Sequence, residues 1–181
     1  MTDLVADQNA VRRYLCDDAP DARLITVRLG STKDEMLDHQ NMPGILKSLC
    51  GELVAACCML SHMLKFDGEM IVQIKGSGPV TMIVAECSSE GRIRSTAQWH
   101  DLTEAASFRE LLGTGYLAVT IDPKQGERYQ GIVPLESDSM EGCINHYFKS
   151  SEQLDTKLWL SSREKSVGGL LIQRLPAEGG R

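Results

Sequence analysis

The feature that most constrains the fold is a long apolar segment that follows Pro43. Proline is favoured in the first turn of a helix, where its missing N–H would have no partner. The residues that recur there with helical periodicity form a wide stripe: Ile45, Leu46, Leu49, Cys50, Leu53, Val54, Cys57, Leu60, Met63 and Leu64. Asp67-Gly68 ends the segment. We therefore expect a long helix that lies buried at the centre of the fold.

Small residues interrupt this stripe at Gly51, Ala55 and Ala56, where they would let another backbone approach closely. The helix is therefore expected to be central and to take part in an oligomer. No apolar run in the chain reaches the length of about 18 residues that a transmembrane helix needs, so no membrane span is expected.

An antiparallel meander is predicted after the helix, with strands at Glu69 to Lys75, Val80 to Cys87 and Arg92 to Trp99. Turns rich in glycine and serine separate these strands. A two-residue hairpin loop at Ser77-Gly78 would place Val72 opposite Ile83 and Ile71 opposite Val84.

Both faces of this meander are predicted to be apolar. One face would carry Met70, Val72, Ile74 and Ile83, and the other Ile71, Val80, Met82, Val84, Ile93 and Trp99. A half-solvated antiparallel sheet would instead alternate apolar and polar residues. We therefore expect helices or a second subunit to cover both faces, unless one face stays free for a partner.

The other segments complete an α+β fold, mainly an antiparallel sheet with a long central helix and flanking helices. Ser31 or Thr32 is expected to cap a short helix. Other helices are predicted at Ala10 to Cys16, Thr103 to Leu112 and Met140 to Lys149. Other strands are predicted at Leu24 to Leu29, Gly115 to Ile121, Glu127 to Val133, Thr156 to Leu160 and Gly169 to Leu175.

Composition excludes some classes of function. Hydrophobic residues make up 42% of the 181 residues and charged residues 24%, as in ordinary globular proteins. The net charge of -6 argues against nucleic acid as a partner, because binding to phosphates needs basic patches. The start Met1-Thr2-Asp3 lacks the basic and apolar regions of a signal peptide, so we expect a cytoplasmic protein with reduced thiols.

Six cysteines could suggest metal or redox chemistry: Cys16, Cys50, Cys57, Cys58, Cys87 and Cys143. None shows C-x-x-C spacing, and four lie in apolar segments, where a thiol behaves as a small hydrophobic group. Cys58 and His62 would form half of a metal site on a helix, but the other half is missing. We therefore predict no metal site, no cofactor and no disulfide among these residues.

No catalytic constellation is visible, and the chain is not expected to be an enzyme. Gly76-Ser77-Gly78 lies between two strands rather than before a helix, so it is interpreted as a hairpin and not as a phosphate loop. Cys143 and His146 are too close along one helix for a convincing dyad. A small cysteine hydrolase or transferase remains an alternative, which a strongly lowered thiol pKa would favour.

Four blocks of residues resemble the 33 kDa chaperonin family of redox-regulated bacterial holdases. The first two blocks are Leu64 to Gly68 with Val72 to Val80, and Leu112 to Leu117 with Gly126 to Gly131. The third is Tyr147-Phe148, Ser151 to Leu154 and Thr156, and the fourth is Gly168 to Leu171 with Leu175-Pro176. Their order and spacing are specific, and the resemblance extends over nearly the whole chain from about Asp7.

The resemblance implies an ATP-independent chaperone that binds unfolding proteins and prevents their aggregation. It also implies a core domain that forms a domain-exchanged homodimer. In the family, a C-terminal zinc centre of four cysteines follows a metastable linker, and oxidation of these cysteines activates the chaperone. None of the six cysteines here matches those zinc ligands, so residues 1–176 would be the core domain and 177–181 the start of the linker, without the zinc domain.

The two apolar faces then suggest where client proteins bind. We expect the face with Ile71, Met82, Val84 and Trp99 to be the client surface, and to be active without oxidation. The alternative is a dimerisation scaffold with little client binding of its own. An aggregation assay on this chain separates these two hypotheses.

Overall fold

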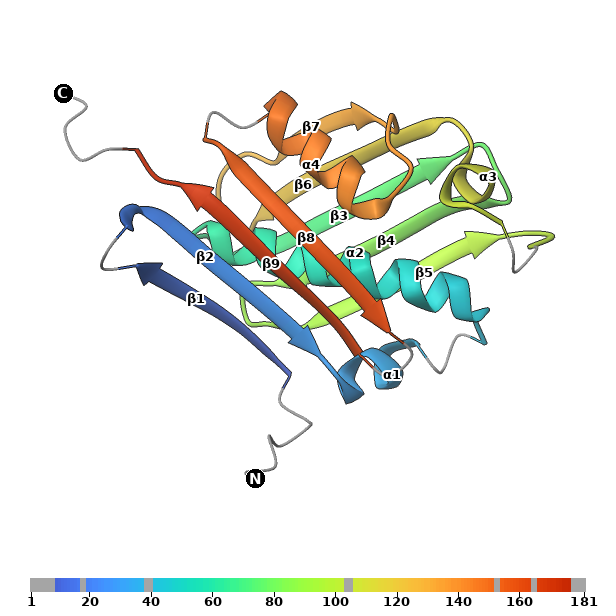
Figure 1. The fold of residues 1–181 in the computed structure, drawn as a ribbon, viewed down its shortest axis with the longest axis horizontal. Coiled ribbons are helices and arrows are strands. Elements are labelled where there is room, and N and C mark those ends of the chain that lie inside the picture. The colour runs from blue at the N-terminus through green and yellow to red at the C-terminus, as the bar shows by residue number, and fades with distance from the viewer. Residues whose placement is uncertain are drawn as a thin grey trace.

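The computed structural model describes residues 9–16, 19–37, 41–102, 106–151, 154–163 and 166–176. In these ranges the chain forms two antiparallel sheets, and helix α2 (Gly44–Met63) lies between them (Figure 1). The α+β class, the antiparallel pairing and the long central helix are therefore as predicted. The helix starts directly after Pro43, as its sequence indicates.

The smaller sheet has four strands in the order β1-β2-β9-β8. These strands are β1 (Ala10–Cys16), β2 (Ala19–Leu29), β8 (Thr156–Arg163) and β9 (Ser166–Arg174). The prediction of a helix over Ala10 to Cys16 is wrong. This segment pairs along its length with β2, for example Val11 with Val27, and the ladder of long-range hydrogen bonds overrides a weak local helical pattern.

The larger sheet has five strands in the order β5-β4-β3-β6-β7. They are β3 (Gly68–Gly76), β4 (Val80–Ser88), β5 (Ile93–Trp99), β6 (Gly115–Pro123) and β7 (Tyr129–Pro134). The predicted meander is confirmed as β3, β4 and β5. The predicted hairpin of β6 and β7 extends the same sheet, because β6 pairs with the other edge of β3.

The register of the first hairpin differs from the prediction. Val72 lies opposite Ala85, and Ile71 lies opposite Glu86. The ladder ends with Lys75 opposite Met82, whereas a two-residue loop would place Lys75 opposite Val80, so the connection holds two residues more than expected.

The glycine-rich turn is a structural element, as interpreted from the sequence. Ser77 N donates to the Thr114 carbonyl at 2.8 Å, and Gly78 N donates to the Leu112 carbonyl at 3.0 Å. A Cβ atom added to Gly78 would lie 2.6 Å from the Leu111 carbonyl oxygen, closer than real side chains approach. The turn therefore needs glycine because another backbone segment packs against it.

Every residue of α2 from Leu53 to Ser61 is buried, so the helix is enclosed on all sides along this stretch. This helix contacts strands of both sheets, so it covers the inner face of each. Among the residues that the structure describes, α2 is the one helix that is long and apolar enough to cross a membrane. However, 72% of the 18-residue stretch that meets this criterion is buried inside the fold. A core helix between two sheets has this property.

Three shorter helices flank the sheets: α1 (Ser31–Leu37), α3 (Phe108–Leu112) and α4 (Met140–Ser151). Helix α3 begins later than predicted, and residues 103–105 of the predicted helix lie outside the described residues. Ser107 caps α3 through a capping box, since its Oγ accepts from Glu110 N and its own N donates to Glu110 Oε2. The predicted apolar side of α4 is confirmed as buried: Cys143, Ile144, Tyr147 and Phe148.

Candidate functional site

The outer face of the five-stranded sheet carries three of the four residues proposed for client binding. Ile71, Met82 and Val84 are half-buried and point away from α2, on the opposite side from the core residues of β3 and β4. Charged and polar neighbours interrupt them, and Glu86 forms an ion pair with Arg94 across β4 and β5. The apolar area on this face is therefore broken into small patches.

The placement of Trp99 on that face is wrong. Met82 lies opposite Gln98, whereas Val80 lies opposite Trp99, so an irregularity of pairing separates Val80 from Met82. Successive residues of a strand point to opposite faces, and Trp99 therefore joins the fully buried Val80 on the core side. Ile93 also lies on the core side, since it pairs with the buried Cys87.

The outer face of the four-stranded sheet has a more continuous apolar area, which sequence reasoning missed. We call it the Trp159 face, and it comprises Tyr14, Leu24, Leu170, Ile172 and Trp159. Tyr14, Leu24 and Ile172 form one row across the strands, and Leu170 and Trp159 lie opposite each other in the next. Tyr14 is 44% exposed and Trp159 is 41% exposed, which is unusual for aromatic rings in the middle of strands.

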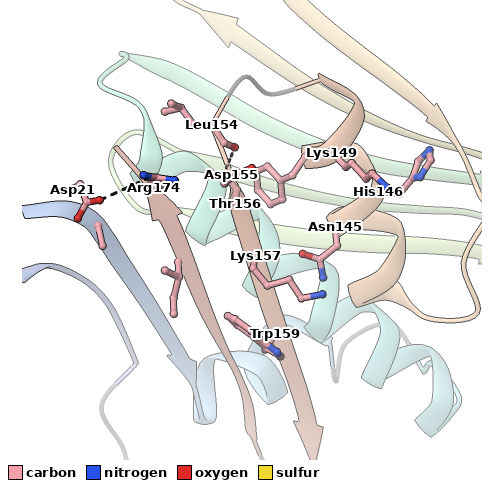
Figure 2. A pocket seen from close by; sticks show the side chains of 13 residues that line it. Asp21, Asn145, His146, Lys149, Leu154, Asp155, Thr156, Lys157, Trp159 and Arg174 are labelled. Carbon is pink, nitrogen blue, oxygen red and sulfur yellow. Dashed lines mark hydrogen bonds and ion pairs between the residues drawn. The ribbon is translucent and has the colours of Figure 1, made fainter. Parts of the chain in front are cut away.

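A groove of about 750 Å³ joins the Trp159 face to helix α4. Figure 2 shows Asn145, His146 and Lys149 on α4 and Lys157 and Trp159 on β8, on the two sides of this groove. Apolar side chains form part of its lining: Ala22, Phe148, Leu154, Trp159 and Ile172.

The rim of the groove carries charges of both signs. Arg174 Nε lies 3.8 Å from Asp21 Oδ2 at one end, where Figure 2 marks the ion pair. Lys149, Lys157 and Asp155 line the rest of the rim. An apolar floor with a mixed polar rim is the composition of a protein-interaction surface rather than of a site for one highly charged ligand.

Side chains of α4 cover the edge of β8 beside this groove. Asn145 donates through Nδ2 to the Leu158 carbonyl at 2.8 Å, and its Oδ1 accepts from Leu158 N at 2.9 Å. Glu141 Oε2 accepts from Leu160 N at 3.0 Å. These bonds satisfy backbone groups on an edge strand that would otherwise be open to a further strand.

The five cysteines whose side chains the structure describes are buried free thiols, as predicted for core packing. Burial raises the pKa of Cys50 to about 11 and also raises the pKa of Cys143. His62 Nδ1 lies 2.9 Å from the Cys58 carbonyl oxygen and 3.1 Å from Ser61 Oγ, so it faces its own helix. Among the described residues no group of three or more His, Cys, Asp or Glu could hold a metal ion.

Cys87 is the exception among these thiols. A hydrogen bond from Cys58, helped by the Ser61 hydroxyl and opposed by burial, lowers the pKa of Cys87 to about 7. This is the property that a cysteine hydrolase or transferase would need. Cys87 is only 1% exposed and faces α2, however, so a substrate would find no space beside its sulfur.

Comparisons with known proteins agree with this architecture. A sequence model of the family described as "Hsp33 protein" matches residues 9–180. The 33 kDa chaperonins of Shewanella sp. strain W3-18-1 and of Shewanella putrefaciens are each 40% identical over 173 residues, which is 95% of this chain and 60% of each relative. The chain thus spans about three fifths of the length of these curated relatives.

The fold is also similar to a solved structure. The crystal structure of the 33 kDa chaperonin of Thermotoga maritima superimposes with a TM-score of 0.78 at 20% sequence identity. The match covers 90% of this chain and 60% of the other chain. This match concerns the fold, whereas the family model and the relatives confirm the family resemblance that the sequence motifs indicated.

Proposed function

The chain belongs to the Hsp33 family, and from this premise we propose that it is the core of an ATP-independent chaperone. It binds unfolding proteins and holds them in a state that does not aggregate. Two of its relatives carry the name 33 kDa chaperonin, and a chaperone rather than an enzyme is the function that this membership favours.

The observation that carries the proposal is the Trp159 face with its groove. Exposed apolar surface in unfolding proteins is buried at a gain of about 25 cal/mol per Å², without requirement for a particular sequence. A surface that presents a tryptophan and a tyrosine beside half-buried aliphatic residues provides such burial for many different clients.

This surface replaces the face of Ile71, Met82 and Val84 as our preferred client site. Around these three residues, on β3, β4 and β5, polar residues separate the apolar ones, and Trp99 packs toward the core instead of outward. On the four-stranded sheet, the apolar residues are neighbours across the strands, and the groove adds apolar area next to them.

An aggregation assay tests the function. The purified chain, kept reduced, is mixed with thermally unfolding citrate synthase, and light scattering is followed over time. We expect suppression of scattering at near-stoichiometric ratios, without ATP and without peroxide. Absence of suppression in both the reduced and the oxidised state would leave the dimerisation scaffold as the better hypothesis.

Paired substitutions test the location of the site. Trp159→Glu introduces a charge into the Trp159 face, and Ser161→Glu introduces the same charge on the same strand and the same face, in a row outside the apolar residues. We expect several-fold weaker suppression from Trp159→Glu and little change from Ser161→Glu. Both variants should keep the circular dichroism spectrum of the wild type.

The second pair tests the other sheet. Val84 and Thr96 lie directly opposite each other on the outer face of the five-stranded sheet. Val84→Glu and Thr96→Glu therefore introduce the same charge at neighbouring positions of that face. Weaker suppression by Val84→Glu, with Trp159→Glu unaffected, would move the client site to the face with Ile71 and Met82.

We further propose, on the resemblance to the family, that the chain is a cytoplasmic homodimer, and that a C-terminal zinc centre controls this core in the whole protein. The small residues Gly51, Ala55 and Ala56 are all on α2, and the last two are fully buried against the sheets of the same chain, so they give no separate support to a dimer. Light scattering over a dilution series measures the oligomeric state, and a monomer at high concentration would contradict the dimer.

A further inference from the structure

The charged residues on the outer face of the four-stranded sheet share one sign. Ile25, Leu158 and Leu171 are fully buried and define the inner face, and residues alternate between the two faces along each strand. By this alternation the outer face carries a group of exposed cations: Arg12, Arg28, Lys157, Arg163 and Arg174. Within their described bounds the strands of this sheet contain one acidic residue, Asp21.

The strand register places these cations around the Trp159 face. Two neighbouring rows across the sheet contain all of its apolar residues, and each row has a cation at one end. The first row is Arg12, Thr26, Leu170 and Trp159, and the second is Tyr14, Leu24, Ile172 and Lys157. Arg28 lies in the row beyond the first, and Arg174 lies in the row beyond the second. The Trp159 face therefore has a positive charge on every side.

The carboxylates that line the groove, Asp21 and Asp155, lie at one end of the sheet, where β9 finishes. Leu175 N donates to the Asp21 carbonyl at 2.6 Å, and Arg174 N donates to the Asp155 carbonyl at 2.9 Å. The Asp21 carboxylate forms its ion pair with Arg174 at that same end. Lys149 of α4 adds an exposed cation on the opposite wall of the groove. Positive and negative charges thus offset each other at this end, whereas the rest of the face is cationic.

This positive face contrasts with the charge of the whole chain, which is -6. The outer face of the five-stranded sheet carries both signs, since Glu69 and Glu86 lie there with Lys75 and Arg94. A positive surface on an acidic chain attracts and orients an anionic partner, and it disfavours a cationic one.

We propose that the Trp159 face selects segments of unfolding proteins in which acidic residues flank a short apolar stretch. This inference rests on the function proposed above and names its class of client. The apolar stretch covers the two apolar rows, and the flanking carboxylates pair with Arg12 at one edge of the sheet and Lys157 at the other. Exposed ion pairs contribute little each, so together they give a preference and not a strict requirement.

The dimensions of the sheet set the length of the apolar stretch. Neighbouring strands lie about 4.8 Å apart, so a row across the four strands is about 14 Å long and matches about four residues of extended chain. The aliphatic residues Leu24, Leu170 and Ile172 lie between the two aromatic rings. This arrangement favours a polypeptide over a single-stranded nucleic acid, whose successive bases stack on aromatic side chains.

Fluorescence anisotropy with labelled peptides tests the selectivity. Three peptides share one apolar stretch of leucine and phenylalanine, and they carry Glu, Gln or Lys on both sides of it. We expect the reduced chain to bind the Glu peptide several-fold more tightly than the Gln peptide, and the Lys peptide several-fold more weakly. Both differences should shrink as the salt concentration is raised, because salt screens exposed charges.

Matched substitutions locate the charges. Lys157→Gln removes a cation beside the Trp159 face, and Lys75→Gln removes the same exposed charge from the outer face of the other sheet. We expect Lys157→Gln to lose part of the preference for the Glu peptide, and addition of Arg12→Gln to remove most of the rest. Lys75→Gln should keep the preference. All these variants should bind the Gln peptide as the wild type does, which shows that they are folded.

Each contrary result has its own meaning. Equal affinity of the wild type for the Glu and Gln peptides would overturn the selectivity and leave the client surface in place. If none of the three peptides binds, the proposed client surface fails as well. An equal loss of preference in Lys75→Gln and Lys157→Gln would mean that overall charge, and not this face, determines the choice. An oligothymidylate that displaces the labelled Glu peptide better than the unlabelled Glu peptide does would assign the face to single-stranded nucleic acid instead.

Discussion

Two glycines in the family motifs are required by the close approach of backbones rather than by flexibility. A Cβ atom at Gly115 would collide with the carbonyl oxygen of Lys75, and one at Gly76 with the carbonyl oxygen of Leu112. Both contacts are to backbone, which cannot turn aside as a side chain can. The sequence Gly76-Ser77-Gly78 that could be mistaken for a phosphate loop is thus explained by packing.

Substitution of Gly115 tests this explanation. We expect Gly115→Ala to lower the free energy of unfolding by about 1–3 kcal/mol, the usual cost of overpacking. Gly168→Ala is the matched control in the other sheet, because its Cβ would lie 3.4 Å from the Val27 carbonyl oxygen, an ordinary contact. Urea denaturation of the three proteins measures the difference, and equal losses for both variants would contradict the argument.

At the residue scale, the sequence predicts which side chains are buried better than it predicts which residues they contact. The apolar surroundings of Cys57 and Cys58 in the sequence indicate that both are buried, and the structure confirms this. Their contact with Cys87 depends on how α2 lies on β4, which no local pattern records. Trp99 was placed on the wrong face for a related reason, since the irregular pairing at Val80 and Met82 depends on the neighbouring strand.

At the scale of elements, the edge of β8 shows how a helix can protect a sheet. Asn145 contributes both a donor and an acceptor to Leu158, so one side chain replaces the missing neighbouring strand at that residue. Glu141 does the same for Leu160 N. The groove beside Trp159 thus has a wall that is fixed to the sheet by hydrogen bonds.

Removal of the Asn145 amide should expose this edge. We expect Asn145→Leu to lower the free energy of unfolding by about 2 kcal/mol, because two backbone groups lose their partners. His146→Ala, at the next position, should cost about 0.5 kcal/mol or less. Thermal or urea unfolding measures both, and a loss no greater than that of His146→Ala would show that α4 does not protect the strand.

The long helix could be predicted from sequence because its signals are local and strong: a proline at its start, an apolar stripe and a glycine after its end. Strand β1 could not, since its seven residues lie on the edge of a sheet and take their conformation from β2. The Trp159 face was missed for the same reason. Its residues come from β1, β2, β8 and β9, and they become neighbours only when the two ends of the chain pair.

At the scale of the whole molecule, α2 makes one core out of two sheets. Residues on its different sides pack against the four-stranded and the five-stranded sheet, and nearly all of its middle is inaccessible to solvent. Neither sheet can separate from α2 without exposing this apolar surface, which costs about 25 cal/mol per Å². The two sheets should therefore unfold together, although no strand pairing joins them within the part of the chain that the structure describes.

The two tryptophans provide a direct test, because Trp99 lies in the five-stranded sheet and Trp159 in the four-stranded sheet. Trp159→Phe leaves a fluorophore in the larger sheet only, and Trp99→Phe leaves one in the smaller sheet only. In each variant we expect the fluorescence transition in urea to coincide with the transition in far-ultraviolet circular dichroism, as a two-state process requires. A Trp159 signal that changes at lower urea than the dichroism would mean that the four-stranded sheet detaches first. The client surface would then belong to a partly unfolded state, in which the inner face of that sheet is exposed as well as the Trp159 face.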